Sequence, residues 1–155
     1  MSVAWIRADA LDEVRRCARD RHPLETGGLL LGWTDDATGD AVVAAIVGPG
    51  PAAKHGRMSF RPDHDWQRAE LARRYAGSGR VHGYLGDWHT HPSGSGRPSD
   101  RDRRTLALIA AAPLARAPKP LLAIVADGPD GTIHVWRHRR RPLSLERLVP
   151  RPYGP

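Results

Sequence analysis

Two uninterrupted apolar runs constrain the fold of this chain more than any other feature of its sequence. Residues 41–47 (AVVAAIV) and 121–126 (LLAIVA) have the length of buried β-strands. They fall far short of the about 20 residues that a membrane-spanning helix needs. Residues 27–33 (GGLLLGW) form a similar run, and the turn-forming residues 34–40 that follow it predict a β-hairpin with the strand at 41–47.

Helices and further strands are expected around these runs. Asp9 can cap a helix that runs to about Arg21, where His22-Pro23 ends it. The other expected elements are helices at residues 62 or 63 to 76 and 99 to 112, strands at 81–88 and 132–137, and a Gly-, Ser- and Pro-rich loop at 89–98. This order predicts an α+β, or mixed α/β, domain with a partly antiparallel sheet.

The chain has 155 residues, which is enough for one domain with a core and too short for two. We expect that domain at residues 1–140, followed by an Arg- and Pro-rich C-terminal tail at 141–155. The single cysteine, Cys17, cannot form an internal disulfide, and the first residues do not read as a signal peptide. A cytoplasmic protein without membrane association is therefore expected.

The formal net charge of +7 invites a nucleic-acid interpretation, because basic surfaces attract phosphate. However, only Lys54 and Lys119 are lysines, and the other basic residues are arginines in a chain rich in Ala, Gly and Pro. These residues share GC-rich codons, so genome composition explains much of the charge. The densest basic stretch, residues 137–141, is predicted to belong to a solvated tail, with a binding patch as the alternative.

The residues with the clearest chemistry are His89 and His91, two positions apart where a strand ends. This spacing points both imidazoles to one side, where they can reach the same cation, and points Thr90 away. Asp102 follows at the start of a helix, and the glycine-rich loop lets that helix fold back. Two histidines and an aspartate are typical of catalytic zinc, with a fourth position for water. The pattern Ser99-x-x-Asp102 is also a helix-capping box, and both interpretations can hold.

Together these residues resemble the signature of the JAMM metallopeptidases, also called the MPN-plus, Mov34 or JAB family. That signature is an upstream glutamate, here Glu25, then His-x-His-Pro at residues 89–92. A serine and an aspartate follow ten and thirteen positions after the first histidine. Ser99 and Asp102 satisfy these offsets, whereas Asp100 does not.

The resemblance extends over about residues 9–137 and implies a curved sheet flanked by helices, with one zinc ion at a sheet edge. It implies that the two histidines and Asp102 bind the zinc. Glu25 would hydrogen-bond the attacking water as the proton shuttle, and Ser99 would donate its hydroxyl to the developing oxyanion.

The resemblance also implies an isopeptidase or peptidase that cuts after the C-terminal glycine of ubiquitin or a ubiquitin-like protein, in deconjugation or precursor processing. The small size resembles bacterial JAMM proteins of anti-phage operons, where E1- and E2-like proteins would be partners. A second hypothesis keeps the zinc and takes a ubiquitin-like sulfur-carrier protein as substrate. A third is a non-catalytic basic scaffold or nucleic-acid-binding domain, which the complete ligand set disfavours.

Overall fold

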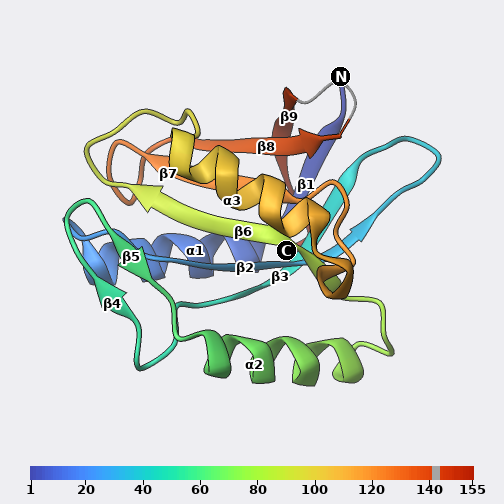
Figure 1. Ribbon diagram of the computed structural model, residues 1–155, viewed down its shortest axis with the longest axis horizontal. Coiled ribbons are helices and arrows are strands. Elements are labelled where there is room, and N and C mark those ends of the chain that lie inside the picture. Colours follow the sequence, from blue (N-terminus) through green and yellow to red (C-terminus); the bar gives the residue numbers. More distant parts are fainter. Residues whose placement is uncertain (141–143) are drawn as a thin grey trace.

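The computed structural model describes residues 1–140 and 144–155, and its main feature is a large sheet that closes on itself as a barrel (Figure 1). The strands of the barrel are β1 (Val3–Arg7), β2 (Gly27–Thr34), β3 (Ala41–Val47), β6 (Gly83–His91), β7 (Leu121–Ala126), β8 (Ile133–Arg139) and β9 (Ser144–Tyr153). They follow the order β1-β3-β2-β6-β7-β8-β9. β1 runs parallel to β3 and β9, and β6 runs parallel to β7, whereas the other pairs are antiparallel.

The helices pack on the barrel, and a short hairpin lies beside it. The helices are α1 (Ala8–Arg21), α2 (His64–Gly77), α3 (Asp100–Ala111) and the 3-10 turn η1 (Pro113–Ala115). The strands of the hairpin are β4 (Lys54–His55) and β5 (Phe60–Arg61). Figure 1 shows α3 in front of β6, β7 and β8, with α2 along the lower edge. Ala10 and Val14 of α1 join the main core, and Leu106 of α3 packs against Leu122 and Ile124. Within the described residues, no helix combines the length and apolarity that a membrane crossing needs.

The predicted mixed α/β class and partly antiparallel sheet are confirmed, and the apolar runs at 41–47 and 121–126 are β3 and β7. β2 and β3 form the predicted antiparallel hairpin. Gly28 and Gly32 of β2 are required because the backbone of β3 approaches them too closely for a side chain. A Cβ at Gly28 would lie 1.8 Å from the carbonyl oxygen of Val47, and one at Gly32 would lie 1.7 Å from that of Val42.

Two expectations about the N-terminal region were wrong. A strand, β1, precedes α1, because Ala4 and Ile6 are buried in the core and the backbone pairs with β3 and β9. Asp9 does not cap α1. The helix begins at Ala8 without a side-chain cap, and Asp9 forms an exposed ion pair with Arg7 at 3.1 Å.

The expectation of a C-terminal tail at 141–155 was wrong for Ser144–Tyr153, which form β9 between β8 and β1. Residues 141–143 lie outside the described part of the chain. Pro150 and Pro152 are tolerated because the β8 pairing ends at Leu148 and the N–H of Val149 already points toward β1, where it bonds the carbonyl of Ser2. The missing proline N–H groups therefore fall on a side where the described part of the chain places no partner strand.

The basic stretch at 137–141 is not wholly solvated, which also differs from the expectation. Arg137 and His138 are buried, and Arg137 pairs with Glu146 of β9 at 2.8 Å. This ion pair links β8 to β9, so at least the first arginine of the stretch has a structural role in closing the barrel.

Candidate metal centre

His89 and His91 lie on β6 itself, not in the loop where they were expected. The strand continues through both residues because β2 and β7 pair with it there, Gly27 with His89 and Ala126 with His91. Strand alternation sends Trp88 and Thr90 into the core and leaves both imidazoles on the opposite face. The predicted orientation of Thr90 is confirmed.

Thr90 connects β6 to the residue that follows Glu25. Its Oγ1 accepts a hydrogen bond from the N–H of Thr26 at 3.0 Å, and its own N–H donates to the Thr26 carbonyl at 2.9 Å. Both threonines are buried. These bonds fix the start of β2 against the end of β6, so they position Glu25 relative to the two histidines.

Asp102 is held by the capping box at the start of α3. Ser99 Oγ accepts from the N–H of Asp102 at 3.1 Å, and the N–H of Ser99 donates to Asp102 Oδ2 at 2.7 Å. The predicted cap is confirmed, and it orients the carboxylate as the sequence pattern indicated. The Ser99 oxygen acts as an acceptor in the cap, which leaves its hydroxyl hydrogen available for another acceptor.

The two imidazoles and the carboxylate converge on one point. The Nε2 atoms of His89 and His91 lie 3.0 Å apart, and each lies 3.6 Å from an oxygen of Asp102. Two ligands about 2.1 Å from a tetrahedral zinc ion would be about 3.4 Å apart. The observed separations of 3.0 and 3.6 Å bracket that value, so the donor set fits a small tetrahedral cation.

Electrostatics at this point favour a cation. Burial would raise the pKa of Asp102, but hydrogen bonds from His89 and His91 outweigh it and hold that pKa well below its usual range. The hydrogen bond to Asp102 raises the pKa of His91, although burial opposes it. The carboxylate therefore stays ionised and attracts positive charge, either a proton on an imidazole or a metal ion.

A hydrogen bond at His91 Nδ1 leaves Nε2 as the nitrogen that faces the centre. His91 Nδ1 lies 2.7 Å from the carbonyl oxygen of Ser95, and because a carbonyl can only accept, Nδ1 carries the proton. Nε2 then presents its lone pair to the centre, as a metal-binding imidazole requires. Ser95 could not be predicted from the sequence, because the bond uses its main-chain carbonyl, a group that every residue possesses.

Glu25 is held by the β4–β5 hairpin. Its N–H donates to the carbonyl of Gly56 at 2.7 Å, and its carbonyl oxygen accepts from His55 Nδ1 at 2.9 Å. Burial raises the pKa of the Glu25 carboxyl, and the nearby His89 and His91 partly offset that rise. The structure thus brings Glu25 into the electrostatic environment of the histidines. The hydrogen bond from His55 to the Glu25 carbonyl was not expected from the sequence.

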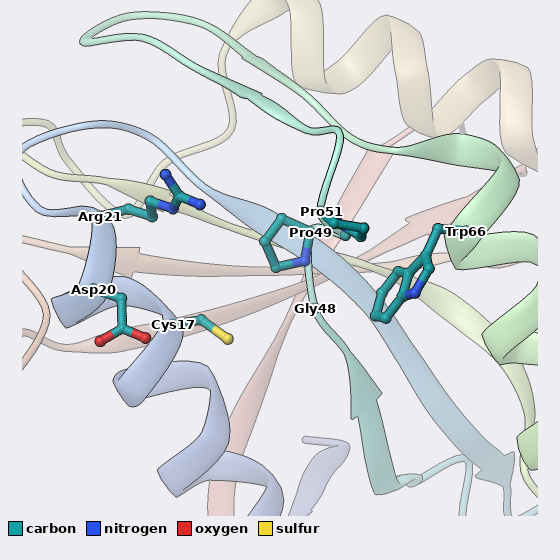
Figure 2. Close-up of a pocket in the computed structure, with 8 residues that line it drawn as sticks. Cys17, Asp20, Arg21, Gly48, Pro49, Pro51 and Trp66 are labelled. Carbon is teal, nitrogen blue, oxygen red and sulfur yellow. The ribbon is translucent and has the colours of Figure 1, made fainter.

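A separate hollow of about 430 Å³ lies between the C-terminal half of α1, the loop that starts at Gly48, and Trp66 of α2 (Figure 2). Cys17 points into it from α1. Burial raises the pKa of this thiol, which keeps it protonated and makes it a poor nucleophile. The lining contains none of the predicted site residues.

The only group of three or more metal-binding side chains within the described residues is the one formed by His89, His91 and Asp102, whose ligand atoms all lie within 4.8 Å of one another. The remaining histidines do not form a second such group there. Asp100, the neighbouring aspartate at the wrong offset, is exposed and lies outside the cluster.

Comparison with known proteins agrees with this geometry. A family model for prokaryotic homologues of the JAB domain matches residues 7–139. The chain is similar to the probable metalloprotease y4qB of Sinorhizobium fredii, with 41% identity over 150 residues that cover 94% of this chain and 91% of that protein. It is also similar to the CD-NTase/cGAS isopeptidase of Enterobacter hormaechei subsp. hoffmannii, with 33% identity over 109 residues, 70% of this chain and 58% of that protein.

A solved structure shows the same fold. The solution structure of protein DSY2949 from Desulfitobacterium hafniense superimposes with a TM-score of 0.72, covering 99% of this chain and 94% of that one at 19% identity. The family model runs from the last residue of β1 to the last residue of β8, so it includes the barrel strands β2, β3, β6, β7 and β8. With a cluster of two histidines and an aspartate suited to a metal ion, this chain belongs to the prokaryotic JAB-domain family of zinc-dependent peptidases.

Proposed function

We propose that this protein is an isopeptidase or peptidase, with one zinc ion per chain, that cleaves after the C-terminal glycine of a ubiquitin-like protein. The observation that carries the proposal is the convergence of His89, His91 and Asp102 within 4.8 Å, with Glu25 in their electrostatic environment. The family match and the relatives named metalloprotease and isopeptidase support it.

His89, His91 and Asp102 would hold the ion, and Ser95 would keep the His91 ring in the required tautomer through its carbonyl oxygen. A zinc ion supplies Lewis acidity at such a centre, where it polarises the attacked carbonyl and acidifies water. Three protein ligands leave a position for the reactants, which distinguishes a catalytic site from a closed structural one.

Glu25 is assigned the proton transfers. Its carboxylate takes a proton from the attacking water and returns it to the leaving amine. The raised pKa that burial gives this carboxyl makes it a stronger base than an exposed glutamate. The hydrogen bond that Glu25 N–H donates to the Gly56 carbonyl and the one that its carbonyl accepts from His55 Nδ1 hold its main chain, so the carboxylate starts from a defined position.

Ser99 is assigned to the oxyanion that forms when the carbonyl is attacked. Its oxygen accepts from the N–H of Asp102, and its hydroxyl hydrogen is free to donate. A neutral donor held in place before the reaction stabilises developing negative charge without reorganisation. Because the cap already fixes Ser99 beside Asp102, the donor lies next to a metal ligand.

A flexible Gly-Gly tail suits the β4–β5 hairpin as a docking strand. Among the described residues each strand of this two-stranded sheet pairs only with the other, and the hairpin contacts Glu25 directly. An extended peptide can add to a free strand edge through main-chain hydrogen bonds. Glycines at the cleavage point would allow the tail to pass close to the metal centre without steric conflict.

We further propose that the conjugates are made by E1- and E2-like proteins of the same operon, in an anti-phage context in the cytoplasm. The support is the relative whose name joins an isopeptidase to a CD-NTase/cGAS system. A sulfur-carrier protein of ubiquitin-like fold is the alternative substrate. Neighbouring genes discriminate between them, since an E1/E2-like pair favours deconjugation and a cysteine or thiamine pathway gene favours sulfur transfer.

Metal analysis of the purified protein tests the centre. We expect roughly one zinc per chain and loss of activity on chelation. Asp102→Ala should lose the metal, whereas the matched control Asp100→Ala, two positions away in the same helical turn, should keep it. Stoichiometric zinc in Asp102→Ala would exclude that residue as a ligand, and a protein that never carries metal would favour the scaffold hypothesis.

A cleavage assay on a ubiquitin-like protein fused through its C-terminal glycine tests the reaction. Glu25→Ala should keep zinc but lose on the order of 10² to 10⁴ in rate, because a positioned general base contributes about that much. A fully active Glu25→Ala enzyme would show that the proton shuttle lies elsewhere.

A further inference from the structure

A cationic cavity of about 360 Å³ lies next to the metal centre, and the proposed reaction does not use it. Its walls come from the loop after β6, from α3 and from the strands β8 and β9. The lining residues are residues 95–97, Arg103, His134, Trp136 and Arg147.

The cavity wall is built tightly on the side of the loop. Trp136 Nε1 donates to the carbonyl of Gly96 at 2.8 Å, which fixes the loop on β8. A Cβ at Gly96 would lie 2.0 Å from the His134 ring, so the loop can approach this closely only with glycine. Arg147 completes the wall, with its guanidinium 5.8 Å above the Trp136 ring and 3.0 Å from His134 Nδ1.

Three arginines give this cavity its positive charge. Arg97, Arg103 and Arg147 all line it, and within the described residues none of them forms an ion pair with a carboxylate. Arg137 of the same strand as Trp136 provides the contrast, since it is paired with Glu146. Three unpaired guanidinium groups around one hollow favour an anionic occupant.

The loop that lines this cavity also contacts the metal centre. Ser95, at the cavity wall, is the residue whose carbonyl holds His91 Nδ1. Gly96 and Arg97 follow it immediately along the loop that leads to Ser99. A polypeptide whose scissile bond lies at His89 and His91 would therefore bring residues a few positions away from that bond to the cavity.

We propose that this cavity receives the carboxylates of Asp or Glu side chains of the protein substrate, within a few residues of the cleaved bond. The proposal rests on the proposed function for its setting, because a polypeptide is then the molecule that lies nearest. A volume of about 360 Å³ is enough for one or two acidic side chains. Guanidinium groups form charge-assisted, often bidentate hydrogen bonds with carboxylates, so these side chains would set which substrates bind well.

Direct binding tests the proposal without requiring cleavage. The protein is the zinc-loaded Glu25→Gln form, and the probes are fluorescein-labelled hexaglutamate and hexaglutamine, compared by fluorescence anisotropy. We expect hexaglutamate to bind at least tenfold more tightly than hexaglutamine at low salt. Adding Arg103→Gln and Arg147→Gln together should remove most of that difference. Arg97→Gln alone, on the exposed loop, should reduce it without risk to the fold.

Matched controls separate the cavity from the general positive charge of the protein. Arg104→Gln lies next to Arg103 on α3, is exposed and does not line the cavity. It removes the same charge, so it should leave the preference for hexaglutamate intact. Equal losses in Arg103→Gln and Arg104→Gln would overturn the proposal. Tighter binding of inorganic phosphate or a short single-stranded DNA at the same arginines would also overturn it, because the site would then be one for phosphate.

The cleavage assay separates this proposal from the proposed function. Substrates that carry Glu or Gln near the scissile bond should differ about tenfold in kcat/KM, and that ratio should approach one in the Arg103→Gln, Arg147→Gln double variant. Cleavage that is indifferent to nearby acidic residues would remove the subsite and leave the peptidase intact. Selective hexaglutamate binding in a protein that cleaves nothing would retain the subsite and remove the peptidase.

Discussion

Replacing Thr90 by valine should both destabilise the fold and disturb the position of Glu25. Thr90 Oγ1 accepts the N–H of Thr26 at 3.0 Å, and the two residues are 4% and 0% exposed, so water cannot replace the lost acceptor. Valine is close to threonine in size. The substitution therefore removes a hydrogen-bond acceptor while leaving the surrounding packing largely in place.

The expected magnitude follows from the unpaired donor. A buried N–H left without an acceptor costs about 1–3 kcal/mol, so Thr90→Val should lower the free energy of unfolding by about 2 kcal/mol. For a domain of this size that corresponds to a fall in Tm of about 4–8 °C. Because Thr26 follows Glu25 directly, kcat should fall more than KM rises.

Urea unfolding and thermal melting of the metal-free protein measure the effect, and steady-state cleavage by the zinc-loaded protein measures the consequence for Glu25. Thr105→Val, on the exposed side of α3, is the matched control and should change stability by no more than about 0.5 kcal/mol. Thr90→Ser keeps the hydroxyl and should recover most of the loss. Wild-type stability and wild-type kcat in Thr90→Val would refute the reasoning.

Three further measurements test other contacts. His55→Ala removes the donor to the Glu25 carbonyl and should lower kcat by about tenfold with little change in bound zinc, whereas an unchanged kcat would show that the hairpin does not position Glu25. A carboxylate partner raises the pKa of His91, so its contribution to metal-free stability is present below about pH 6.5 and lost as pH rises through the raised value. The Tm difference between the metal-free wild type and His91→Asn should therefore shrink from about pH 6 to pH 8, and zinc should reverse that trend because protons compete with the metal. Arg137→Met leaves Glu146 without its partner and should cost about 2 kcal/mol in urea unfolding, with no effect on zinc content; a neutral result would show that the ion pair does not help to close the barrel.

Features that depend on neighbouring residues could be predicted from the sequence. β3 and β7 are strand-length apolar runs, and the capping box of Ser99 and Asp102 lies within one helical turn. The pair His89 and His91 is a strand-alternation pattern over three residues. Each of these depends on spacing alone, so reading residue types at fixed offsets was sufficient.

Elements whose stability depends on distant partners were missed. β1 has five residues, and its pairing with β3 and β9 is what makes it a strand. β9 contains Pro150 and Pro152, which argue against a strand unless the free side of the backbone is known. That side is determined by where the pairing with β8 stops, near the start of β8, which is a property of the closed barrel.

The candidate metal centre also has features that the sequence predicts and features that depend on distant parts of the fold. The sequence by itself predicted the metal-binding side chains His89, His91 and Asp102 from their residue types and spacing, and the resemblance to the JAMM signature added Glu25 and Ser99 as proposed catalytic residues. Only the tertiary structure decided what holds these side chains in place. The Gly56 carbonyl and the His55 imidazole hold the main chain of Glu25, and the Ser95 carbonyl holds the His91 ring. Most of these contacts use main-chain atoms, which every residue possesses, so only the folded barrel could show which of them meet.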